Sequence, residues 1–97
     1  MEEPHRSGGN DFVWEHSKAA ANRRKHEIRF EDAATVFMDP LFVLIDVSRN
    51  DEGREAAIGF DHLGGRLFVV DIELEGDIIR SVPARPAEPL EEALYAQ

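Results

Sequence analysis

The side chains that could do chemistry are cations and acid–base groups, distributed unevenly along the 97 residues. A basic cluster occupies Arg23-Arg24-Lys25-His26, and Arg54, Arg66, Arg80 and Arg85 follow among acidic residues. A metal-independent ribonuclease needs a base for the 2′-hydroxyl proton, an acid for the leaving oxygen and cations for the charged transition state. These residue types could fill all three roles, but most domains of this size contain such a set.

Each of these groups also has a purely structural explanation. Cations in the last turn of a helix interact favourably with the helix dipole, which would explain the basic cluster. An arginine beside Asp or Glu forms a surface ion pair worth about 0–1 kcal/mol. Arg80 is harder to explain in this way, because it lies among Ile78, Ile79 and Val82 in a predicted strand.

The composition excludes several classes of protein. The absence of cysteine excludes disulfides and cysteine-bound zinc and fits a reducing compartment. The four histidines lack metal-ligand spacing, and no nucleotide-binding motif is present, so we expect no cofactor. The N-terminus has no signal-peptide pattern, and the longest apolar run, 41–45, is far shorter than the roughly 20 residues that span a bilayer. We therefore expect a cytoplasmic protein with no membrane partner.

The net charge of −9 comes from the second part of the chain. Residues 1–30 hold six Lys and Arg against five Asp and Glu, whereas residues 31–97 hold five Arg against fifteen Asp and Glu. A basic face is therefore expected near the N-terminus. The acidic remainder should lower non-specific affinity for nucleic acid and could attract a basic partner.

The elements that must position these groups begin after a polar, glycine-rich stretch. Residues 1–11 are predicted to be a disordered lead-in, and residues 12–97 a single domain. Residues 18–26 contain three consecutive alanines and predict a helix that ends in the basic cluster. Residues 31–38 predict a second helix with an apolar stripe, which Asp39-Pro40 ends.

From there the apolar pattern changes to a period of two. Strands are predicted at 41–47, 55–61, 66–74 and 78–82, with a turn at 50–53, and a short helix at 90–95. Because the connections are short, neighbouring strands should be antiparallel. The predicted fold class is α+β: two N-terminal helices packed on a four-stranded antiparallel meander sheet, with a short C-terminal helix.

The most specific part of the sequence is the run Phe12-x-Trp14-x4-Ala19-x2-Asn22-x2-Lys25-His26-x-Ile28-x-Phe30-x2-Ala33-x2-Val36-Phe37-x-Asp39-Pro40. This run resembles the BrnT family of type II toxins. Later segments agree with the family too, namely Arg54-x3-Ile58-Gly59, Gly65-Arg66-Leu67, Arg80, Ala84-Arg85-Pro86-Ala87, Glu91 and Tyr95. The resemblance covers the chain from Phe12 to Tyr95.

The resemblance implies a RelE-like fold and RNA cleavage that stops translation. It also implies a cognate antitoxin with a ribbon-helix-helix DNA-binding part, through which the complex would bind operator DNA. By position, it carries over an RNA-binding or catalytic set: Lys25, His26, Arg54, Arg80, Arg85 and Glu91. It does not say which of them is the base.

The chain departs from the family pattern at several positions. Glu27 replaces the glycine after the Lys-His pair, which removes an easy left-handed helix end. Ile72-Glu73 stands where many relatives have His or Tyr before Thr, and Pro83 replaces a serine. The segment 88–94 is acidic and apolar, whereas relatives have a basic helix there.

These departures leave three functions open. The first is an active ribonuclease toxin. The second is a catalytically weak or inactive toxin-like domain that acts mainly by binding its antitoxin in operon autoregulation. The third is a stand-alone binding domain unrelated to toxins.

Overall fold

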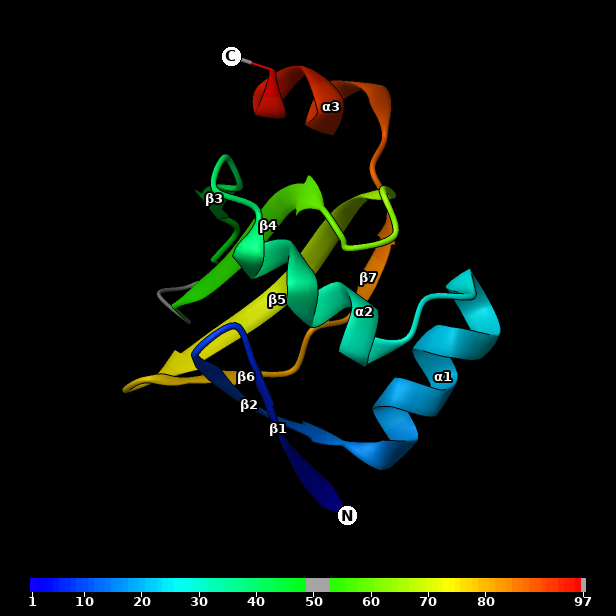
Figure 1. Cartoon of the computed structure of the whole chain (residues 1–97), viewed down its shortest axis with the longest axis vertical. Coiled ribbons are helices and arrows are strands. Elements are labelled where there is room, and N and C mark those ends of the chain that lie inside the picture. Colours follow the sequence, from blue (N-terminus) through cyan, green and yellow to red (C-terminus); the bar gives the residue numbers. More distant parts are fainter. Residues whose placement is uncertain (49–52, 97) are drawn as a thin grey trace.

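The computed structural model describes residues 1–48 and 53–96 (Figure 1). The elements are β1 (Glu2–Ser7), β2 (Asn10–Glu15), α1 (His16–His26), α2 (Phe30–Ala34), the 3₁₀ turn η1 (Thr35–Met38), β3 (Val43–Asp46), β4 (Arg54–Phe60), β5 (Arg66–Glu75), β6 (Ile78–Arg80), β7 (Ala84–Pro86) and α3 (Pro89–Tyr95). The turn predicted at 50–53 falls largely on residues 49–52, which lie outside the described residues. No helix in the described ranges is long and apolar enough to cross a membrane.

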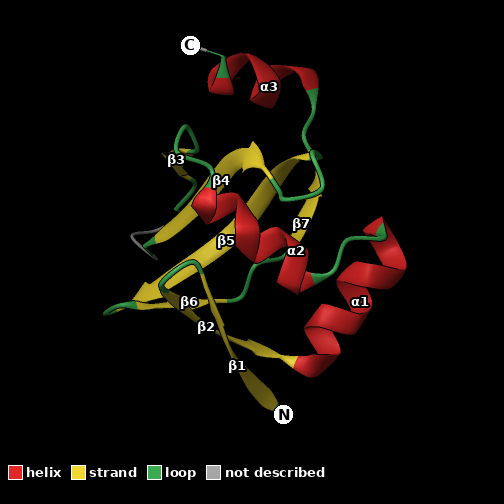
Figure 2. Ribbon diagram, viewed as in Figure 1, coloured by secondary structure: helices red, strands yellow, loops and turns green. Residues whose placement is uncertain are grey.

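The sheet is larger than predicted and is mixed (Figure 2). Its order is β1-β2-β6-β5-β4-β3, and β7 pairs with β5. Neighbours pair antiparallel except β2 and β6, which run parallel. The predicted RelE-like α+β fold, with two N-terminal helices on a four-stranded meander, is therefore wrong: the described residues form seven strands and three α-helices.

The first cause of this difference is the N-terminal hairpin. Gly8 and Gly9 both have positive φ, of 57° and 83°, between paired residues Ser7 and Asn10. This is the backbone of a two-residue type I′ turn, which glycine favours and which matches the twist of a hairpin. Residues 1–11, expected as a disordered lead-in, thus hold β1 and the start of β2.

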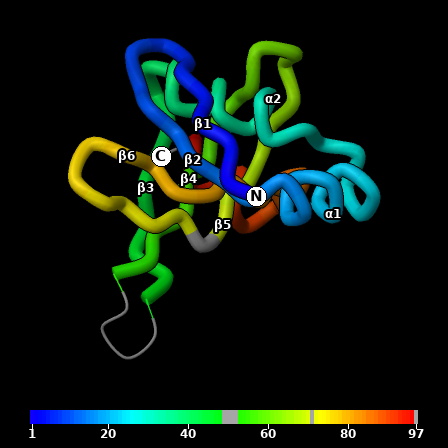
Figure 3. The backbone as a smooth tube through the Cα atoms, turned by 90° about the horizontal axis from the view of Figure 1, so that it is seen from below, coloured from blue at the N-terminus to red at the C-terminus, as the bar shows by residue number. Residues whose placement is uncertain are grey.

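The second cause is helix α1, which does not lie flat on the sheet. It stands at the side of the molecule away from the β5–β6 turn, as Figures 1 and 3 show from two directions. Its alanines offer little apolar surface, and the one buried residue is Asn22. Asn22 Nδ2 donates to the Ile28 carbonyl at 3.0 Å, and Asn22 Oδ1 accepts from the Ala84 amide at 3.1 Å. A polar clamp therefore ties α1 to β7.

The core is aromatic where the hairpin meets α2. Phe12 and Trp14 alternate inward from β2 and are only 2% and 4% exposed. The Trp14 ring meets fully buried Phe30 edge-on, with 5.4 Å between centroids, and Phe12 lies 5.8 Å from Phe37. Such pairs add about 0.5–1.5 kcal/mol to the free energy of burial. The hairpin is therefore part of the domain, and it forms one wall of the site described next.

Candidate active site

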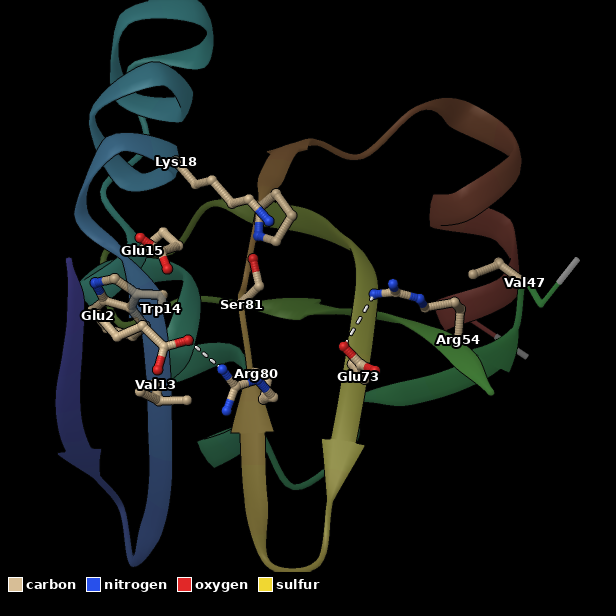
Figure 4. Close-up of a pocket in the computed structure, with 11 residues that line it drawn as sticks. Glu2, Val13, Trp14, Glu15, Lys18, Val47, Arg54, Glu73, Arg80 and Ser81 are labelled. Carbon is tan, nitrogen blue, oxygen red and sulfur yellow. Dashed lines mark hydrogen bonds and ion pairs between the residues drawn. The ribbon is translucent and has the colours of Figure 1, made fainter. Parts of the chain in front are cut away.

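A groove of about 610 Å³ lies where β2, β6 and β5 meet the N-terminal half of α1 (Figure 4). Among its lining residues, the groups that could act on a ligand are Lys18, Arg54, Glu73, Arg80 and Ser81. They come from α1, β4, β5, β6 and the segment after β6. The groove therefore gathers cations and a carboxylate that are far apart in the sequence.

Three of these residues form a row across the sheet. Arg54 of β4 is paired with Glu73 of β5, and Glu73 with Arg80 of β6. Side chains of directly opposite residues share one face, with Cβ atoms about 4.5–5.5 Å apart. Arg54 Nη1 lies 3.6 Å from Glu73 Oε2. The sheet register thus holds one carboxylate between two guanidinium groups.

Arg80 is held by two carboxylates, one from β1 and one from β5. It forms an ion pair with Glu2 of β1, drawn in Figure 4, and its Nη1 lies 3.5 Å from Glu75 Oε2. The predicted strand residue that was hardest to explain as a surface ion pair is thus paired, yet it also lines the groove. The Arg80 guanidinium could bind a phosphate only if it first released at least one of its two carboxylate partners.

Ser81 has a strained backbone. Its φ of 66° is in the left-handed region, which costs a residue with a side chain on the order of 1–2 kcal/mol. The Ser81 amide donates to the Val13 carbonyl at 3.0 Å, and its side chain projects toward the groove between Lys18 and Arg80 (Figure 4). Sequence reasoning missed this residue, because nothing local marks a serine for positive φ.

The groove is electrically balanced. Its lining includes the cations Lys18, Arg54 and Arg80 and the carboxylates Glu2, Glu15 and Glu73. Glu15 lies 3.1 Å from the N-terminal amine. The arrangement can bind a phosphodiester through cations and offers acid–base groups beside them, which is the set that metal-free phosphodiester cleavage requires.

Lys25 and His26 lie at the other end of α1 and do not line the groove. The helix ends at Glu27, which adopts the left-handed conformation (φ 59°, ψ 28°) and donates its amide to the Arg23 carbonyl at 2.8 Å. Lys25 follows Lys18 by seven residues, so both lie on one face of the helix, about 10 Å apart along its axis. Lys25 could therefore extend the cationic lining of the groove.

Arg85 and Glu91 are brought together, but away from the groove lining. They form a two-fold ion pair, with nitrogen–oxygen distances of 2.9 and 2.8 Å, and the Arg85 guanidinium lies over the Phe68 ring. Hydrogen bonding to Arg85 is the main reason why the pKa of Glu91 is lowered, and the same bond raises the pKa of Arg85. The pair fastens α3 to β7.

Asp39 fixes the other end of α3. Burial opposes ionisation of this carboxyl, but hydrogen bonds from the Phe60 amide (3.0 Å), the Leu41 amide (2.9 Å) and the Tyr95 hydroxyl (2.8 Å) together lower its pKa. The bond to Asp39 in turn raises the pKa of Tyr95. Asp39 therefore has a structural role beyond ending a helix.

No three His, Asp or Glu side chains in the described part of the chain gather into a set that could hold a metal ion. The groove residues are instead suited to ionic contact with phosphate.

Comparison with known proteins gives one family. No curated protein matches the chain. The family model described as the ribonuclease toxin BrnT of type II toxin–antitoxin systems matches residues 14–91, which include all of α1 and the Arg54–Glu73–Arg80 row. The chain therefore belongs to the BrnT family of ribonuclease toxins of type II toxin–antitoxin systems.

Proposed function

We propose that this toxin is a metal-independent ribonuclease of the cytoplasm that blocks translation, and that the groove is its active site. The carrying observation is the row in which Arg54 and Arg80 flank Glu73 inside the groove. Two guanidinium groups that share a sheet face can hold one phosphate from two sides, and they stabilise the charge that develops on it during attack.

The RNA would leave the groove along α1. Lys18 lines the groove, and Lys25 lies on the same helix face beyond it. Neither lysine forms an ion pair with another residue of the described part of the chain, so both can contact phosphate without losing a partner. His26, Arg85 and Glu91 have no contact with the groove that favours a catalytic role, so we place the chemistry on the row.

The toxin would be neutralised by a cognate antitoxin with a ribbon-helix-helix DNA-binding part. The net charge of −9 complements a basic DNA-binding partner and opposes direct contact with DNA. Operator DNA would therefore be bound only through the antitoxin, and the complex would repress its own operon.

A second function is favoured by the charge balance of the groove. Each of its two arginines has a carboxylate partner, and the acidic helix α3, outside the groove lining, adds negative charge to the molecule. A protein with this groove could be a weak or inactive enzyme whose main role is to bind its antitoxin. Catalysis and antitoxin binding are therefore to be measured separately.

The test is induced expression followed by an assay of the purified protein. Expression should arrest growth, and Arg80→Ala or Arg54→Ala should relieve the arrest, with Lys25→Ala giving partial relief. The purified toxin should cleave single-stranded RNA at low salt, where electrostatic binding is strongest. It should do so in the presence of EDTA, because the proposed reaction needs no metal. Arg6→Ala is a matched control, since Arg6 is paired with Asp11 outside the groove lining.

Two results would count against the enzyme. Intact RNA at low salt, together with normal growth on induction, would favour the antitoxin-binding role. Cleavage that is lost with EDTA and restored by Mg²⁺ would contradict metal independence.

A further inference from the structure

Glu73 differs from the other carboxylates that line the groove. Glu2 is engaged by Arg80, and Glu15 lies against the N-terminal amine. Glu73 contacts Arg54 at the longer distance of 3.6 Å, and its side chain is as exposed as that of Glu2, at 47% against 46%. No histidine or tyrosine is among the described residues that line the groove. Glu73 is therefore the lining carboxylate that the sheet register places between Arg54 and Arg80.

We infer that Glu73 is the general base of the ribonuclease, an inference that rests on the activity proposed above. Its carboxylate takes the proton of the 2′-hydroxyl while that oxygen bonds to phosphorus and the bond from phosphorus to the 5′-oxygen breaks. The products are a 2′,3′-cyclic phosphate and a 5′-hydroxyl. The leaving oxygen takes its proton from water, and Glu73 releases its own proton to water.

The flanking arginines would position the RNA relative to Glu73. A phosphate held between Arg54 and Arg80 sits above the middle position of the row, which Glu73 occupies. Neighbouring positions in the row are about 5 Å apart, so the 2′-hydroxyl next to such a phosphate comes within hydrogen-bond reach of the carboxylate. The arginines then stabilise the charge on the phosphoryl oxygens as the proton leaves.

The experiment compares Glu73→Gln with Glu75→Gln. Both variants remove one negative charge and one arginine contact from the same face of β5, but Glu75 does not line the groove. The readouts are kcat and KM on a 5′-labelled single-stranded RNA and binding of its non-cleavable 2′-O-methyl analogue. Thermal melting checks that each variant is folded.

We expect Glu73→Gln to lower kcat by about 10²–10⁴-fold, the usual contribution of a general base. Its affinity for the analogue should equal or exceed that of the wild type, because a negative charge has been removed. Glu75→Gln should keep kcat within about 3-fold of the wild type, since its loss removes no proton acceptor. Glu73→Asp retains a carboxylate and should be more active than Glu73→Gln.

Several outcomes would overturn the inference alone. They are unchanged kcat in Glu73→Gln, an equal loss in Glu75→Gln, or a fall in affinity for the analogue that parallels the loss of rate. If Glu73→Gln does not fold, a Glu73→Asp variant that is folded but inactive would also overturn the inference. Failure of the wild type to cleave RNA would instead refute the proposed ribonuclease, and the assignment of Glu73 with it.

Discussion

Replacing Glu2 by glutamine should raise the affinity of the groove for RNA. Glu2 forms an ion pair with Arg80 and lines the same groove, so its carboxylate occupies a guanidinium that a phosphate needs. It is also a negative charge that any bound phosphate must approach. Glutamine keeps the size of the side chain and removes both effects.

The expected gain follows from exposure and distance. The side chains of Arg80 and Glu2 are 31% and 46% exposed, so their ion pair is of the kind that contributes about 0–1 kcal/mol. Repulsion between a carboxylate and a phosphate about 6 Å apart in water adds about 0.7 kcal/mol. Together these correspond to about 0.7–1.7 kcal/mol, or about 3- to 20-fold tighter binding.

The assay is fluorescence anisotropy with the 2′-O-methyl analogue, first at low salt and then at high salt. Glu3→Gln is the matched control, because Glu3 is next in sequence, carries the same charge and is paired with His16 Nδ1 at 2.8 Å outside the groove lining. The advantage of Glu2→Gln should shrink at high salt, where screening weakens exposed charge interactions. Equal gains in the two variants would refute a specific contact and leave only an effect of net charge.

Three further predictions concern stability. Glu27→Gly should raise the free energy of unfolding by about 1 kcal/mol, measured by denaturant titration, because φ is 59° there; an unchanged midpoint would contradict this. Glu91→Gln should lower the free energy of unfolding by about 1–2 kcal/mol, since the two-fold bond to Arg85 is weakened. Hydrogen exchange should become faster in α3 than in the rest of the chain. The pKa of Asp39 is lower in the folded protein than in the unfolded chain. Ionised Asp39 therefore adds to the free energy of unfolding above the unfolded pKa, and this contribution is lost as the pH falls through the folded pKa. Acid titrations should therefore show a shallower loss of stability for Asp39→Asn, which is also less stable at neutral pH; parallel curves would contradict this.

The N-terminal hairpin shows why composition misled the fold prediction. A polar stretch with two glycines is typical of disorder, yet Gly8-Gly9 between strand-length segments is also a type I′ turn signal. The distinction depends on whether Phe12 and Trp14 find a core. That core includes Phe30 and Phe37, which are brought to the hairpin by helix and turn packing that no local pattern encodes.

Alternation along 66–74 predicts a strand with Phe68, Val70, Ile72 and Leu74 on one face and Asp71 and Glu73 on the other, and this assignment is only partly right. Phe68 and Val70 and, on the other face, Leu67 and Val69 are all apolar, so a period of two fits either assignment. The structure buries Leu67 and Val69 and leaves Phe68 only partly covered, beneath the guanidinium of Arg85. Arginine stacking on a partly buried aromatic ring is a tertiary feature that sequence spacing does not reveal.

The composition of the groove could be predicted only in part. Arg54 and Arg80 were candidates from the sequence, but the residue between them is set by the register of β4, β5 and β6. Lys18 joins them because α1 follows directly on β2, which pairs in parallel with β6. Parallel pairing of segments so far apart in the chain has no local signature, and the same holds for the strained backbone of Ser81.

Because the charges in the groove are balanced, weak binding of RNA would not by itself show that the protein lacks catalytic activity. In the ground state, a phosphate gains little from Arg54 and Arg80, because each already has a carboxylate partner. During attack, negative charge on the phosphoryl oxygens grows, so the arginines interact more strongly with the transition state than with bound RNA. Only interactions that strengthen in this way accelerate the chemical step. An RNA affinity that is low for a basic nuclease is therefore compatible with a high kcat, and kcat rather than Kd decides between the toxin as enzyme and the toxin as antitoxin-binding partner.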